Sequence, residues 1–156
     1  MRRRLKAIAL AAALAGGAGG WYLFRPERAL LDRVVDETLP AGGQIIRAAS
    51  FESRTHHGRG TADIIQLGER RVLRFRNFDV LDGPDLQVYL LRDASASGRA
   101  GLAAGYVSLG ALKGNVGNQY YDIPAGVDLD RFAGVAVWCR RFGVNFATAT
   151  FEELRM

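Results

Sequence analysis

Apolar and polar residues alternate with a period of two along most of the chain after residue 43. Residues 70–76 show the pattern well, because Leu73 and Phe75 fall on one face of an extended segment while Arg74 and Arg76 fall on the other. Such alternation is typical of a strand that buries one face. The same pattern predicts further strands at residues 44–48, 61–67, 86–91, 106–109, 119–123, 134–139 and 145–151.

Turn-forming sequences separate these segments, and no long helical pattern interrupts them. Glycine, proline, asparagine and aspartate cluster at residues 57–60, 82–84, 97–98, 113–115 and 124–126. About seven or eight short strands with turns at this spacing predict an all-β domain over residues 41–153. We expect an antiparallel β-sandwich or a flattened barrel.

The first 24 residues predict a signal anchor or a signal peptide. An arginine- and lysine-rich start is followed by residues 7–24, which carry no charge. As a helix, this stretch would span about 27 Å, close to the roughly 30 Å hydrocarbon core of a bilayer. Aromatic residues beside Arg25 suit the headgroup layer and favour an uncleaved transmembrane anchor, whereas residues 13–15 would serve as the cleavage site of a removable signal peptide.

The basic start also predicts where the rest of the chain lies. Positive residues stay on the cytoplasmic side, so the chain after Arg25 is expected on the extracytoplasmic, periplasmic side of the cell membrane. Residues 25–40 are expected to form a short juxtamembrane helix and a linker, because Leu30, Leu31, Val34 and Val35 would share one side of a helix.

The charge balance argues against a nucleic-acid partner. The chain has 21 basic and 16 acidic residues, but four of the basic ones precede residue 7. The remainder carries 17 basic and 16 acidic residues and is nearly neutral. It lacks the excess positive charge that neutralises phosphates, so we expect no binding to nucleic acid.

Three blocks of sequence, at residues 77–90, 109–124 and 137–146, resemble the DM-thirteen domain in order and spacing. This family is a small β-rich domain named for electron transfer, and it occurs alone in bacterial membrane-associated proteins. The family's proposed functional cysteine follows a tryptophan and maps onto Cys139, and its histidine maps onto His57 or His56. The resemblance implies a redox role, through a bare thiol or a bound haem, together with a redox partner protein.

Cys139 is the one cysteine of the chain, and three interpretations of it stay open. On a strand it would share a face with Val135 and Val137, which is typical of a buried, inert thiol. It also precedes Arg140 and Arg141, whose charge would favour a reactive thiolate or a ligand. An intermolecular disulfide is the third interpretation, because exported proteins tend to pair their cysteines.

The sequence offers few ligands for a cofactor or a metal. It has no C-x-x-C-H motif for covalent haem, and His56 and His57 are adjacent, so they do not suit opposite axial positions on one iron. No spacing of histidine and cysteine predicts zinc. Asp79, Asp82 and Asp85 lack the EF-hand spacing, so turn capping explains them better than calcium.

A second function also fits the composition. Four aromatic residues, Tyr89, Tyr120, Tyr121 and Trp138, would suit a sugar-binding platform, although aromatic residues more commonly fill a core. The alternative to a redox role is therefore a non-catalytic binding module for cell-envelope polysaccharide or for a protein partner. Either role describes a redox or binding domain better than a stand-alone enzyme.

Overall fold

Nine strands form one continuous sheet in the computed structural model, which describes residues 13–14, 16–17, 20, 31–38, 42–54, 57–95 and 99–152. The strands are β1 Val34–Asp36, β2 Gln44–Ser53, β3 Gly58–Leu67, β4 Arg70–Val80, β5 Leu86–Leu91, β6 Tyr106–Ala111, β7 Val116–Ile123, β8 Gly134–Cys139 and β9 Val144–Thr150. Two short helical segments accompany them, α2 at Arg99–Ala103 and the 3-10 turn η2 at Leu129–Arg131.

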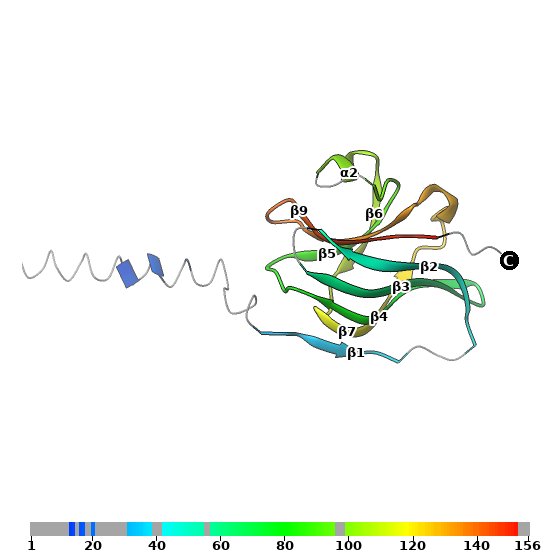
Figure 1. Ribbon diagram of the computed structural model, residues 1–156, viewed down its shortest axis with the longest axis horizontal. Helices are drawn as coiled ribbons and strands as arrows, with labels where there is room; N and C mark the ends of the chain where they lie inside the picture. The colour runs from blue at the N-terminus through cyan, green and yellow to red at the C-terminus, as the bar shows by residue number, and fades with distance from the viewer. Residues whose placement is uncertain are drawn as a thin grey trace, which may run out of the picture.

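The sheet has the strand order β1-β7-β4-β3-β2-β9-β8-β5-β6 and curls into a half-barrel (Figure 1). Strand β2 carries the bend, because residues 44–50 pair with β3, with an irregularity at Ile46, and the last three, Phe51 to Ser53, pair with β9. Neighbouring strands are antiparallel except at the edge, where β1 runs parallel to β7. The all-β class is therefore confirmed, with nine strands in place of the seven or eight expected.

The two halves of the curled sheet enclose the main core. Its largest side chains come from β4, where the rings of Phe75 and Phe78 lie 4.9 Å apart, each also 4.9 Å from Phe51. The opposite half contributes Val88, Leu90, Val135 and other apolar side chains. Burial of these faces is the main stabilising term of such a fold.

A second, smaller cluster lies on the outer face of β5 and β8. Tyr89, Leu91, Ala136 and Trp138 form it, and Leu102 of α2 packs against them. Figure 1 shows α2 on this outer side of the sheet. Strand β8 is therefore buried on both faces, with valines toward the main core and Trp138 toward α2.

The prediction of a short helix over residues 25–40 is wrong for the described part of that segment. Val34–Asp36 is extended and forms β1 on the edge of β7. Its β-branched valines suit a strand, and the free edge of β7 offers unpaired backbone groups. Gly117 permits the close approach, because a Cβ there would lie 2.0 Å from the carbonyl oxygen of Val35. Residues 25–30 lie outside the described residues.

Side chains hold β1 in place in addition to its backbone pairing with β7. Arg33 donates two hydrogen bonds of 3.0 Å to Asp82, and its backbone N–H donates to the Asn115 side chain at 2.6 Å. At the other end, Lys113 donates to both oxygens of Glu37 at 2.8 and 2.9 Å. The chain that enters the domain is thus fixed to it from residue 32 onward.

Most of the N-terminal segment, for which a membrane anchor or signal helix is expected, lies outside the described residues. Within residues 1–24 the structure describes Ala13, Leu14, Gly16, Gly17 and Gly20, which are helical. Within the described residues, no helix combines the length and hydropathy that a membrane crossing requires.

Candidate functional site

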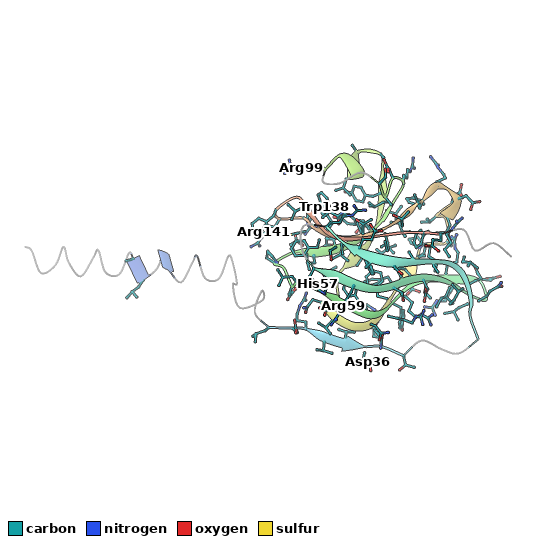
Figure 2. The ribbon with its side chains drawn as sticks, in the orientation of Figure 1. Asp36, His57, Arg59, Arg99, Trp138 and Arg141 are labelled. Carbon is teal, nitrogen blue, oxygen red and sulfur yellow. The ribbon has the colours of Figure 1, made fainter. Side chains whose placement is uncertain are left out.

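Cys139 and His57, the sequence-predicted site residues that the structure describes, lie at one end of the sheet, which we call the turn end. It carries the β8–β9 turn at residues 140–143, the loops at 81–85 and 112–115, and the start of β1. The strand register places these segments together, because Cys139 pairs with both Leu86 and Val144, and Gly58 pairs with Val80. Figure 2 shows His57, Arg59 and Arg141 at this end.

Cys139 is the last residue of β8, and it is fully buried. Its exposed fraction is 0%, and it belongs to the main core together with Val135 and Val137. The face assignment made from the alternation is therefore confirmed. Its backbone carbonyl accepts a hydrogen bond of 2.8 Å from Gly143, which closes the turn directly above it. A thiol in this position is not reachable by a partner's sulfur while the turn is closed.

His57 lies in an exposed position just before β3. The next residue, Gly58, is buried because its Cα packs against Ala147 of β9, where a Cβ would come within 2.6 Å of the alanine methyl group. Ser53 and Gly58 exchange hydrogen bonds of 3.1 and 3.3 Å that fix the hairpin. His56, the other histidine expected at the site, lies outside the described residues.

His57 and Cys139 share the turn end but do not form a ligand pair. Gly58 contacts Ala147, whereas Cys139 pairs with Val144, and three residues along a strand correspond to about 10 Å. The imidazole is also exposed, while the thiol faces the core. A haem held between the two does not fit these residues in the closed structure.

The three aspartates near this end are each paired with a different arginine. Asp79 contacts Arg59 at 2.6 Å, and Asp82 accepts both hydrogen bonds from Arg33. Asp85 contacts Arg140 at 2.9 Å, and the hydrogen bond and charge of Asp85 raise the pKa of Arg140.

These carboxylates therefore do not gather around a cation. Asp82 also caps the following turn, because its carboxylate accepts a hydrogen bond of 2.8 Å from the backbone N–H of Gly83. Within the part of the chain that the structure describes, no group of three or more histidine, cysteine, aspartate or glutamate side chains is placed to hold a metal ion.

The four aromatic residues considered for a sugar platform are mostly part of the interior. Tyr89, Tyr121 and Trp138 are each 4–5% exposed. Tyr120 is half-buried, and the ammonium group of Lys113 lies 4.7 Å from its ring centroid. The core interpretation is therefore confirmed for Tyr89, Tyr121 and Trp138 but not for Tyr120.

Sequence reasoning missed a buried polar network beside the site. Gln119 is 1% exposed and bonds both backbone groups of Gly114, and the Tyr121 hydroxyl donates to Gln119 at 2.7 Å. Burial raises the pKa of Tyr121, so its phenol stays protonated. Such a network cannot be read from residue type or spacing, because amide and phenol side chains also occur on protein surfaces.

Of the comparisons with known proteins, the one with family models gives a match. The model of the family described as electron transfer DM13 matches residues 50–151, which include all strands from β3 to β9. No curated protein matches the chain, and no solved structure matches it. Because the matched region covers well over half of the sequence, the chain belongs to the DM13 electron-transfer domain family.

Proposed function

We propose that this domain is a thiol-redox electron-transfer module that works outside the cytoplasm, with Cys139 as its active group. Three observations support the proposal. The family is described by electron transfer, the chain has a single cysteine, and that cysteine is the last residue of a strand beside an exposed turn.

The position of the cysteine at a strand end carries the proposal. A buried thiol reacts only when the structure above it opens, and strand ends open at lower free energy than strand centres. The turn is closed by the Gly143 hydrogen bond to Cys139 and by a 3.0 Å hydrogen bond from Arg140 N–H to the carbonyl of Asp85. The side chains of Arg140, Arg141 and Phe142 are exposed, so opening costs little apolar burial.

The chemistry in the open form is thiol–disulfide exchange with a redox partner protein. The Cys139 thiol gives its proton to water, because the thiolate is the nucleophile in this exchange. The thiolate attacks one sulfur of a disulfide on the partner, so one S–S bond forms, one breaks, and the partner's second sulfur leaves as a thiolate. Because the chain holds one cysteine, a dithiol of a second protein resolves the mixed disulfide. Its first sulfur attacks Cys139, so the first partner leaves with both sulfurs reduced, and its second sulfur then releases the Cys139 thiol and closes the new disulfide.

The proposed location is the extracytoplasmic side of the cell membrane. The support is the basic start of the chain followed by the uncharged residues 7–24, which together are typical of a signal anchor. An oxidising compartment of this kind also supplies protein disulfides as reaction partners.

The rate at which the folded chain reacts with a thiol reagent tests the proposal. We expect labelling of Cys139 through local opening, with a free energy well below that of global unfolding measured in urea on the same preparation. Equal free energies for labelling and unfolding would make Cys139 a core residue only, and would leave the non-catalytic binding module as the better description.

A matched pair of glycine variants locates the opening. Gly143 has φ of +65° in the β8–β9 turn and Gly68 has φ of +59° in the β3–β4 turn at the opposite end. Alanine in the left-handed region costs about 1 kcal/mol, so Gly143→Ala should speed labelling about fivefold by weakening the closed turn. Gly68→Ala carries the same backbone cost and should leave the opening of the β8–β9 turn unchanged. The pair differs in one contact, because an added Cβ at Gly143 also meets the flexible end of the Arg99 side chain at 2.9 Å, whereas one at Gly68 meets nothing within 4 Å.

A further inference from the structure

The turn end exposes an unusual share of the apolar surface of the domain. Seven large hydrophobic side chains are exposed among the described residues, and one of them, Leu14, precedes the domain. Four of the other six lie at the turn end, namely Leu31, Val34, Leu81 and Phe142, with exposed fractions of 65%, 69%, 43% and 53%. An accumulation of this kind marks an interaction surface.

The ion pairs at this end direct their positive members outward. Side-chain exposure is 38% for Arg33 against 2% for Asp82, 68% for Arg59 against 28% for Asp79, and 68% for Arg140 against 22% for Asp85. At the opposite end the order is reversed, with Arg47 at 23% and Asp130 at 87%.

Two carboxylates at the turn end do not follow this rule. Glu52 is more exposed than its partner Arg54, and Asp32 is exposed while it accepts a hydrogen bond from Asn115. Apart from these two carboxylates, the outermost charged groups of the turn end are the guanidinium groups of Arg33, Arg59, Arg140 and Arg141. They lie on the same end of the domain as the exposed apolar side chains.

The path of the chain brings this surface close to the uncharged N-terminal stretch. Strand β1 begins at the turn end and is fixed there by the bonds of Arg33 to Asp82 and Asn115. From Phe24 to Leu31 the chain advances seven residues, which reach at most about 25 Å when extended. An 11-residue strand such as β4 is about 35 Å long, so the opposite end of the domain lies well beyond that reach.

We propose that the turn end docks on the surface of an anionic phospholipid bilayer. Phe142 and Leu81 enter the interface between headgroups and acyl chains, and the outward guanidinium groups bind lipid phosphates. This inference rests on the proposed membrane location, and it places the β8–β9 turn above Cys139 against the membrane.

A fluorescent label at the turn end of the full-length chain tests the docking. The background is Cys139→Ala, which frees the chain of other thiols, and Phe142→Cys carries bimane in vesicles of phosphatidylcholine and phosphatidylglycerol. The matched control is Ala125→Cys, which is exposed in the turn after β7 at the opposite end. Leu81→Cys gives a second label at the turn end in case the first variant does not fold.

We expect blue-shifted emission and quenching by lipids brominated near the headgroup for the labels at residues 142 and 81, and neither effect at residue 125. The shift should shrink when phosphatidylcholine replaces the anionic lipid, because the guanidinium groups lose part of their attraction. Equal, water-like emission at residues 142, 81 and 125 would overturn the docking.

Alkaline carbonate extraction of the same vesicles distinguishes failure of the proposed docking from failure of the proposed membrane anchor. A chain that stays in the membrane while both turn-end labels remain in water contradicts the docking alone. A chain that is extracted by carbonate contradicts the membrane anchor, while the emission of the labels at residues 142 and 81 still decides the docking.

Discussion

The thiol of Cys139 and the indole of Trp138 lie on opposite faces of β8, although the two residues are consecutive in the sequence. The thiol belongs to the main core with Val137, while the indole packs with Tyr89 beneath α2. Both are almost fully buried, at 0% and 4% exposure. The C-terminal end of β8 is therefore covered on one face by the curled sheet and on the other by α2.

Polarity at position 139 should matter more for stability than volume does. Cys139→Ser places a hydroxyl in an apolar core and should lower the free energy of unfolding by about 1–3 kcal/mol, because a buried hydroxyl without a partner is costly. Cys139→Ala loses only a small apolar group and should cost less. Urea unfolding monitored by circular dichroism measures both. A serine variant as stable as the alanine variant would mean that water reaches the site.

The ion pair between Glu37 and Lys113 should contribute to stability only above acidic pH. Partial burial acts to raise the pKa of Glu37, but hydrogen bonds from Lys113 and from the backbone of Tyr120, with the charge of Lys113, outweigh it and lower that pKa. A lowered folded pKa stabilises the protein above the unfolded value near 4.5, and this stabilisation is lost as pH falls through the folded value.

The variant Glu37→Gln tests this linkage. Because the pair is partly exposed, the difference in unfolding free energy at pH 7 should stay below about 1 kcal/mol. It should shrink steadily below about pH 4.5 as the carboxylate of the parent protein is protonated. A difference that is constant between pH 7 and pH 3 would mean that the charge of Glu37 plays no part.

Local periodicity predicted most of the fold because most strands follow one rule. Eight strands were recognised, some from alternation and others, such as β8, from a short apolar run bounded by turn residues, and β5 and β8 match their predicted limits at both ends. Strand β1 was missed because three residues are too short for any period to be read. What makes it a strand is the free edge of β7 and partners about 80 residues away, such as Asn115 for Arg33.

The candidate site was predictable in outline only. Alternation correctly placed Cys139 on the face of Val135 and Val137, but its depth depends on how the sheet curls over that face. Turn capping by Asp82 was expected from the local sequence, but its pairing with Arg33 was not, because the two residues are 49 positions apart. Pairings over such distances are consequences of the folded sheet and leave no periodic trace in the sequence.

The positive φ of Asn77 should make this position selective for residue type. Asn77 has φ of +48° at the irregularity between Phe75 and Phe78 in β4, and its backbone N–H donates to the side chain of Asn118 at 3.0 Å. Asparagine tolerates this conformation better than most residues, so Asn77→Ala should destabilise the fold by about 1 kcal/mol. Asn77→Gly should leave the stability nearly unchanged, and thermal unfolding of both variants measures the difference. Equal losses of stability in the two variants would mean that the asparagine side chain, and not the backbone conformation, accounts for the effect.

Alanine variants of two glycines with similar φ should distinguish the cost of backbone strain from the loss of β1 pairing. Gly117 has φ of +113° and Gly110 has φ of +105°, but an added Cβ at Gly117 would lie 2.0 Å from Val35 oxygen, whereas one at Gly110 would meet nothing within 4 Å. Both alanine variants pay the backbone cost of about 1–3 kcal/mol. Only Gly117→Ala should also displace β1, which hydrogen exchange at the Glu37 amide, bonded to the Asn118 carbonyl at 2.8 Å, would report as lost protection. If exchange there is equally fast in both variants, the parallel pairing of β1 with β7 does not depend on the missing side chain at Gly117, and the bonds of Arg33 and Glu37 hold the strand alone.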